Sequence, residues 1–171
     1  CFEEISEIDE HCSRLISNFS KKFSQVLEND VPSNTNGFES IINMCAKVLG
    51  VNSAKEFEDT ALNTSLTSGI QIDMKLINHD GKNYLDYRRI VQSIMAYKMA
   101  DVDNITLIYS FYESLSEFIC NYVNEISNDI KTKDVVLCGN MFANSILLSK
   151  TNKTLSKTYN IILPREYPLD Y

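Results

Sequence analysis

Two short, strongly apolar segments near the end of the chain constrain its fold most strongly, and the first of them is a continuous apolar run. Residues 134–138 and 159–163 are made almost entirely of apolar and strand-forming residues, and a segment of helical length separates them. Uninterrupted apolar runs are typical of parallel strands that are covered on both faces. A strand, a helix and a second strand in this order predict a right-handed crossover between two parallel strands. We therefore expect a β-α-β unit over residues 134–171.

Apolar residues at steps of three and four predict helices through most of the remaining chain. The expected helices span residues 2–27, 38–49, 53–61, 86–99 and 106–130. Between them, alternating apolar residues and an Asp80-Gly81 turn predict a β-hairpin at about residues 69–86. The expected fold class is α+β to α/β and helix-rich. Its three parts are an N-terminal amphipathic helix in 1–29, a helical region with the hairpin in 30–133, and the β-α-β unit.

Charge and cysteine content exclude several classes of protein. The chain has 16 basic and 23 acidic residues and a net charge of −7, whereas nucleic-acid-binding proteins usually carry a basic stripe. No apolar run approaches the length of a membrane-spanning helix. The five cysteines show no CxxC spacing, so we expect free thiols and a cytoplasmic location. We expect neither nucleic-acid nor membrane binding, and we expect the chain to be a fragment of a longer protein.

The turn after the first C-terminal strand is the candidate binding element. Gly139 has no side chain, so a ligand can approach the main chain there. A helix expected to begin near Met141 would present free N–H groups and a positive dipole end to a phosphate. Asn144, in the first turn of that helix, could bind a sugar or a phosphate. Ligands of open α/β sheets bind beyond the carboxyl ends of the strands, so Gly139, Asn140 and residues 164–170 are expected at one rim. A purely structural tight turn is the other interpretation.

This region resembles a known family. The run Leu-Cys-Gly-Asn-Met-Phe-Ala-Asn-Ser-Ile-Leu-Leu, followed by Ile-Leu-Pro-Arg-Glu-Tyr-Pro-Leu-Asp, is similar to the hydrogenase-maturation carbamoyltransferases (HypF-like). These proteins are related to the threonylcarbamoyltransferases that modify tRNA. Residues 56–61 resemble the family's Tyr-Glu-Gly-x-Ala-Ala segment, and residues 110–115 stand where the family has Phe-His. The resemblance covers roughly residues 30–171 and depends on the order of the segments.

The resemblance implies the C-terminal lobe of a Kae1-like domain with an actin/hexokinase-like (ASKHA) fold. That family transfers a carbamoyl group from carbamoyl-adenylate, made with ATP, to the C-terminal cysteine of a hydrogenase-maturation acceptor protein. By resemblance, Gly139 and Asn140 would face the adenylate, Asn144 would support the loop, and Asp170 would bind a divalent metal. We expect no catalytic residue in this chain, no tight binding of the cofactors by this chain alone, and no activity without the rest of the domain.

The family's paired-histidine metal motif belongs to the first lobe and is absent from this sequence, so this chain alone is not expected to catalyse. Two departures from the family pattern favour a different interpretation. Asn140 replaces the second glycine of a Gly-Gly pair, and Tyr112 replaces the histidine of the Phe-His pair. The alternative function is therefore a non-catalytic protein-interaction module of mainly helical fold.

Overall fold

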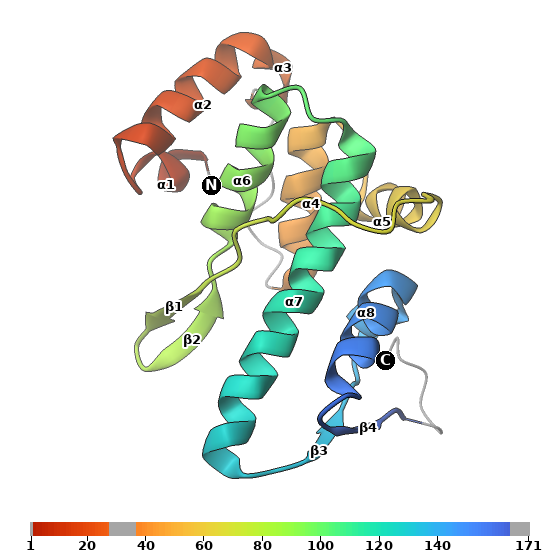
Figure 1. Ribbon diagram of the computed structural model, residues 1–171. Coiled ribbons are helices and arrows are strands. Elements are labelled where there is room, and N and C mark those ends of the chain that lie inside the picture. The colour runs from red at the N-terminus through yellow and green to blue at the C-terminus, as the bar shows by residue number, and fades with distance from the viewer. Residues whose placement is uncertain (1, 28–36, 165–171) are drawn as a thin grey trace.

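The computed structural model describes residues 2–27 and 37–164, which fold into a helical body with two small sheets (Figure 1). The elements in chain order are α1 (Phe2–Ser6), α2 (Glu10–Lys22), α3 (Ser24–Leu27), α4 (Phe38–Leu49), α5 (Ala54–Leu62), β1 (Leu76–His79), β2 (Lys82–Leu85), α6 (Tyr87–Met99), α7 (Asn104–Ile130), β3 (Asp134–Val136), the 3₁₀ helix η1 (Asn140–Ala143), α8 (Ser145–Leu155) and β4 (Asn160–Ile162). None of the described helices combines the length and the apolar character needed to cross a membrane.

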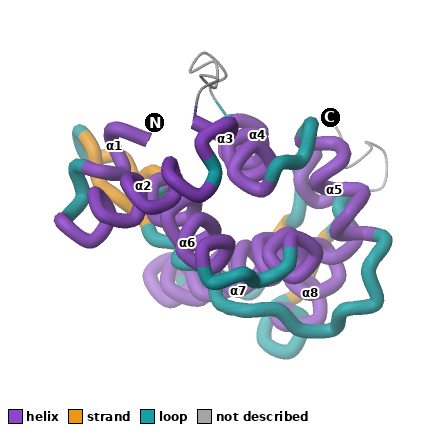
Figure 2. Tube along the Cα trace, turned by 90° about the horizontal axis from the view of Figure 1, so that it is seen from above, coloured by secondary structure: helices purple, strands orange, loops and turns teal. Residues whose placement is uncertain are grey.

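The helices are arranged around α6 and α7, which lie side by side in the middle of the body (Figure 2). Helices α1 and α2 pack against α6 on one side. Helices α5 and α8 pack against α7 on the other side, and α8 makes the more extensive contact. This arrangement brings α5 and α8 together, although they are far apart in the sequence.

The prediction of one long N-terminal helix was wrong. The described part of this segment is broken into α1, α2 and α3. The Asp9 side chain accepts a hydrogen bond from the backbone N–H of Cys12 and so starts a new helix. Phe23 takes a non-helical conformation that ends α2. The apolar spacing continues across both breaks because all three helices turn the same face to the body.

The main core contains a group of aromatic rings contributed by α5 and α7. Phe57 is fully buried, and its ring lies edge-on to Phe111 with 5.5 Å between the ring centres. Phe111 is in turn edge-on to Tyr112 at 5.3 Å. Edge-on ring pairs at these distances stabilise a core beyond the burial of their area. This group therefore fixes α5 against α7.

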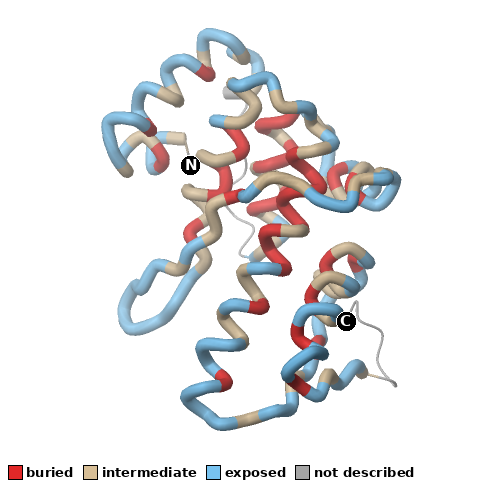
Figure 3. Tube along the Cα trace, viewed as in Figure 1, coloured by how far each residue is buried: buried red, intermediate tan, exposed pale blue. Residues whose placement is uncertain are grey.

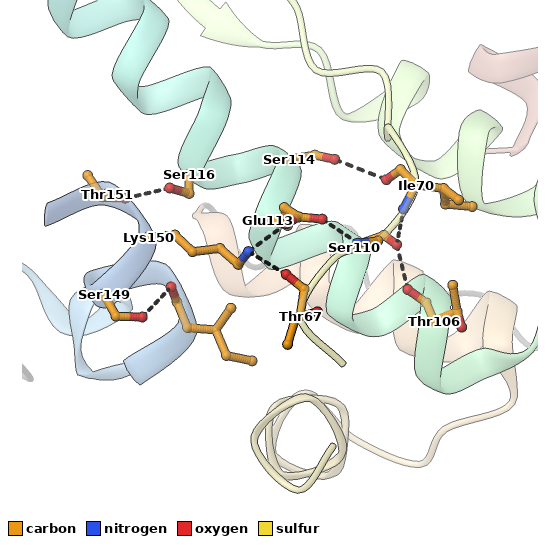
Figure 4. A network of polar contacts seen from close by, with 12 residues as sticks. Thr67, Ile70, Thr106, Ser110, Glu113, Ser114, Ser116, Ser149, Lys150 and Thr151 are labelled. Atoms are coloured by element: carbon orange, nitrogen blue, oxygen red, sulfur yellow. Dashed lines mark hydrogen bonds and ion pairs between the residues drawn. The ribbon is translucent and has the colours of Figure 1, made fainter. Parts of the chain in front are cut away.

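Residues 67–75, which precede the hairpin, cross α7 in an extended conformation without being paired as a strand. We call them the crossing segment. The sequence predicted that the hairpin begins at about residue 69, but β1 begins only at Leu76. The backbone N–H of Ile70 donates to Ser110 Oγ at 2.9 Å (Figure 4). The backbone N–H of Ile72 donates to Ser114 Oγ at 2.9 Å. Side chains of a helix thus satisfy donors that a neighbouring strand would otherwise bond, so the alternating pattern is explained without a sheet.

The predicted hairpin turn is confirmed at Asp80 and Gly81. Both residues have positive φ angles, 51° and 76°, and they join β1 to β2 in an antiparallel pair. Positive φ at both central residues is the geometry that favours Asp-Gly in two-residue hairpin turns. The hairpin is shorter than predicted because residues 69–75, which were expected to belong to its first strand, lie in the crossing segment instead.

Most of the buried residues of helix α7 lie in its first half. Leu107, Ile108 and Phe111 are fully buried, whereas Ile126 and Ile130 near its end are exposed (Figure 3). The last turns of α7 extend beyond the main core, and their side toward α8 packs in a second, smaller cluster of Cys120, Leu137, Leu155 and Tyr159.

The start of α7 provides a prediction about pH. The carboxylate of Asp103 accepts hydrogen bonds from Thr106 N at 2.8 Å and Thr106 Oγ1 at 2.7 Å, and these bonds lower the pKa of Asp103 below its ordinary value. Replacing Asp103 with alanine is expected to lower the free energy of unfolding by about 1 kcal/mol at pH 7. A depressed pKa stabilises the fold above the ordinary value, and this stabilisation is lost as the pH falls through the folded-state pKa. Urea unfolding of both proteins should therefore show a smaller difference at pH 3, and an equal difference would contradict the charged cap.

The predicted β-α-β unit is confirmed. Strands β3 and β4 pair in parallel, with Val136 opposite Ile162, and α8 forms the connection between them. The strands are not covered on both faces, however: Val136 is 57% exposed and Ile162 is 43% exposed. Within the described residues, α7 and α8 cover one face of this sheet and leave the other open.

Candidate functional site

The candidate site is the turn between β3 and α8, residues 139–144, which we call the Gly139 turn. Gly139 has φ 106° and ψ 153°, a conformation that residues with a side chain rarely adopt. A Cβ atom placed on Gly139 would meet nothing within 4 Å, and both Gly139 and Asn140 are exposed. The backbone conformation requires glycine here, and the main chain of the turn is open to an approaching ligand.

The helix does not begin where the sequence predicted. Residues Asn140–Ala143 form the short 3₁₀ helix η1, and α8 begins only at Ser145. Asn144 precedes it and caps it: its side-chain oxygen accepts hydrogen bonds from the backbone N–H groups of Ile146 and Leu147, each at 3.1 Å. These N–H groups are therefore satisfied by the protein, and the expected array of free donors at a helix terminus is not next to Gly139.

The side chain of Asn144 is buried and makes hydrogen bonds within the protein. It is 1% exposed, so its side chain does not contact solvent at the turn. Besides capping α8, its Nδ2 donates a hydrogen bond to Glu58 Oε1 at 3.0 Å. The sequence-based idea that Asn144 itself binds a sugar or phosphate is not supported by this burial. Its supporting role at the loop, the other expectation, agrees with the geometry.

Glu58 is the residue at this site that sequence reasoning missed. It lies on α5 next to Phe57 and reaches the start of α8 through Asn144. Its segment, residues 56–61, had been matched to a family segment that contains a glutamate. That match was the available signal, but the residues themselves gave no reason to bring Glu58 close to Asn144.

Tyr112 lies in the core next to this site. Burial raises the pKa of Tyr112 far above its ordinary value, and the charge of Glu58 raises it further. The ring centres of Phe57 and Tyr112 are 6.1 Å apart. The phenol is therefore neutral at any physiological pH, and Tyr112 places no positive charge beside Glu58, as a protonated histidine would.

The structure also bears on the expected metal site. Asp170 lies outside the described residues, so its predicted role as a metal ligand stays a prediction. Among residues 2–27 and 37–164, no group of three or more His, Cys, Asp or Glu side chains is placed to hold a metal ion.

Two surface hollows in the described part of the chain lie away from the Gly139 turn. One, of about 460 Å³, is formed by the end of α5, the following loop and Ile105 at the start of α7. The other, of about 240 Å³, lies between α7 and α8 and is lined by charged residues that include Lys150, Lys153 and Glu117. Neither hollow is lined by a residue of the Gly139 turn, and Gly139 and Asn140 are exposed at the surface.

Comparison with known proteins agrees with these features. A sequence model described as the second subdomain of the carbamoyltransferase Kae1-like domain matches residues 36–170. Protein HydE of Wolinella succinogenes is 26% identical over 184 residues, which cover 99% of this chain and 33% of that protein. This chain thus spans about a third of the length of that curated relative.

A solved structure shares the fold. It is described as full-length HypF in the phosphate- and nucleotide-bound form, and it matches with a TM-score of 0.70 at 17% sequence identity. The match covers 99% of this chain and 22% of the HypF chain. It confirms the expected helix-rich, ASKHA-like lobe. Together with the family match over most of the sequence, it shows that this chain belongs to the carbamoyltransferase Kae1-like domain family, as part of its second subdomain.

Proposed function

We propose that this chain is the second lobe of a carbamoyltransferase domain acting in nickel–iron hydrogenase maturation, and that it supplies half of a site for ATP and carbamoyl-adenylate. The observation that carries the proposal is the Gly139 turn, where exposed main chain follows the carboxyl end of a parallel strand. This is the position at which open α/β sheets bind ligands. The nucleotide-bound state of the related HypF structure supports the same assignment.

In this proposal each residue of the turn has a distinct task. The main chain at Gly139 approaches the phosphate, because no Cβ stands between them. Asn140 lies beside it with an exposed side chain whose amide can donate a hydrogen bond to a ligand oxygen. Asn144 keeps the turn attached to α8. Further contacts to the ligand would come from the other lobe of the domain.

A divalent metal and an acceptor protein belong to the same proposal. Asp170 would be one of the metal ligands, and a metal bound there would neutralise phosphate charge. The acceptor would be a hydrogenase-maturation protein with a C-terminal cysteine, and its sulfur would bond to the carbamoyl carbon as the bond from that carbon to the phosphate oxygen breaks. We propose a cytoplasmic location for these proteins.

A non-catalytic interaction module is the second candidate function. The observation that favours it is the open face of the β3–β4 sheet, where the paired residues Val136 and Ile162 are exposed. Exposed apolar groups of this kind are typical of protein contacts. In that case Gly139 would serve only to form the turn, and its replacement would leave nucleotide binding unchanged.

The test is a pair of glycine substitutions in the full-length protein. Gly139→Ala is expected to weaken binding of a non-hydrolysable ATP analogue at least tenfold, because the new Cβ forces the main chain away from its open conformation. A side chain at the φ and ψ of Gly139, a region that is essentially restricted to glycine, costs about 1–3 kcal/mol, and a tenfold loss of affinity corresponds to about 1.4 kcal/mol. Isothermal titration calorimetry measures the affinity.

Gly81→Ala is the matched control. Gly81 also has a positive φ, 76°, and open space around its Cβ position, but it lies at the tip of the hairpin. Both variants place a side chain at a positive φ angle, but only Gly139 lies at the site, so only the Gly139 variant should lose affinity. Equal nucleotide affinity in wild type and Gly139→Ala would overturn the assignment of the turn and favour the interaction module.

A further inference from the structure

The contact between Glu58 and Asn144 joins two helices that the sequence separates widely. Glu58 Oε1 accepts from Asn144 Nδ2 at 3.0 Å, and Asn144 Oδ1 at the same time accepts from two backbone N–H groups of α8. The Asn144 side chain is buried and held at both of its polar ends. Its conformation is therefore fixed, and it holds the Glu58 carboxylate in one orientation relative to the Gly139 turn.

The carboxylate of Glu58 is only partly used by the protein. Its Oε1 atom bonds to Asn144, and among the described residues no ion pair or second hydrogen bond involves Glu58. Removing a carboxylate from water is costly when no cation or set of donors compensates it. A neutral acceptor would satisfy the Asn144 amide at lower cost. A half-buried carboxylate with a free oxygen is consistent with a ligand that completes its hydrogen bonding.

The residues next to Glu58 on the core side do not orient its carboxylate. Phe57 beside it is fixed in the core, and the phenol of Tyr112 is neutral, so neither neighbour offers a charge that could orient the carboxylate. Asn144 is the described residue that does so. The backbone of Asn144 is in turn tied to the turn through Met141, whose carbonyl oxygen accepts from Asn144 N at 3.2 Å.

We infer that Asn144 is a positioning residue, which fixes the Glu58 carboxylate beside the Gly139 turn so that its free oxygen can accept a hydrogen bond from the bound nucleotide. This inference rests on the proposed function, since it assigns Glu58 and Asn144 tasks within that site. It differs from a simple capping role for Asn144, because capping requires only the side-chain oxygen, whereas positioning requires the side-chain nitrogen.

Asn144→Asp separates these two roles. Aspartate is as good a helix cap as asparagine, so the oxygen contacts to Ile146 and Leu147 are expected to remain. It has no N–H to donate and places a second carboxylate against Glu58, which repels it. In the full-length protein we expect at least a tenfold loss of affinity for the ATP analogue, with amide hydrogen exchange in the first turn of α8 unchanged. Asn144→Ala should lose both the affinity for the ATP analogue and the protection of the first turn of α8 from hydrogen exchange.

Asn121→Asp makes the same chemical change at an exposed position on α7 and is expected to change neither measurement. Wild-type affinity in Asn144→Asp would overturn the positioning role.

A second measurement does not depend on nucleotide binding. Asn144→Asp should lower the melting temperature, and adding Glu58→Gln to it should restore most of the loss, because the Gln amide can then donate to the new aspartate. If wild-type protein binds no nucleotide but this rescue is seen, the proposed function fails and the coupling of the two residues holds. If the double variant shows no rescue, the inference itself is overturned.

Discussion

Gly69→Ala is expected to lower the free energy of unfolding by about 3 kcal/mol, because overpacking a tight contact costs up to this amount. A Cβ on Gly69 would lie 2.9 Å from the Cα of Ser110 and closer still to its hydroxyl oxygen. The Cα belongs to the buried part of α7 and cannot move aside. The crossing segment would have to lift away from α7, losing the bonds from Gly69 N to Glu113 and from Ile70 N to Ser110.

Urea unfolding followed by circular dichroism measures this effect. Ser110→Ala serves as the control, since it removes the hydrogen bond to Ile70 while leaving room for the segment, and its cost should be about 1 kcal/mol. A loss in Gly69→Ala no larger than the loss in Ser110→Ala would show that the close approach is not needed. Comparing the two variants therefore separates the cost of the steric clash at Gly69 from the cost of losing the hydrogen bond between Ile70 and Ser110.

Phe57→Ala is expected to cost about 4 kcal/mol, within the range for removing a fully buried phenylalanine ring. Phe57 is 0% exposed and touches the rings of both Phe111 and Tyr112, so its loss leaves a cavity between α5 and α7. The same change should loosen α5 and with it the hold on Glu58. Thermal unfolding measures the stability, and hydrogen exchange in α5 measures the local effect.

Phe57→Leu provides the matched comparison, because it keeps most of the apolar volume and should cost about 1.5 kcal/mol. Leucine has no ring to meet Phe111 edge-on, so the difference between the two variants reports mainly the cavity. If both substitutions cost the same small amount, the aromatic group would not be what fixes α5. The position of Glu58 would then have to depend on other contacts of α5.

The stability predictions and the binding predictions concern connected parts of the molecule. Lys150 on α8 forms an ion pair with Glu113 of α7 at 2.5 Å and also donates to the carbonyl oxygen of Thr67 in the crossing segment (Figure 4). The crossing segment, α7 and α8 are thus joined by polar contacts on the side of α7 that faces α8. Because α8 also carries Asn144 at its start, disturbing the crossing segment is expected to reach the Gly139 turn through α8.

Local sequence signals predicted those elements whose cause is itself local. Ser53 followed by Glu56 is a capping-box sequence, and the Ser53 hydroxyl accepts a hydrogen bond from Glu56 N. Gly50 ends α4 with a φ of 73°, a conformation that glycine adopts at little cost. The Asp80-Gly81 turn is likewise determined by its own two residues, both of which adopt a positive φ angle. In each case the residues that determine the conformation lie within a few positions of one another, so the sequence contains the whole explanation.

Periodicity was less reliable wherever burial came from a distant segment. It predicted a single helix at the N-terminus, because the breaks at Asp9 and Phe23 do not interrupt the apolar face. It predicted a strand at Ile70 and Ile72, because an extended segment packed on a helix has the same alternation as one paired in a sheet. Apolar periodicity indicates which side chains are buried, but it does not indicate which segment of the chain covers them.

The sequence by itself determined the helix-rich fold, the parallel β-α-β unit and the glycine at its turn, since these follow from apolar spacing, helix caps and backbone freedom. Only the tertiary structure decided that Asn144 faces inward and meets Glu58, and that Gly69 lies against Ser110. These pairs are separated by 86 and by about 40 positions along the chain, and no local preference of either residue specifies its partner. Packing α5 and α8 against the same helix brings Asn144 and Glu58 into contact.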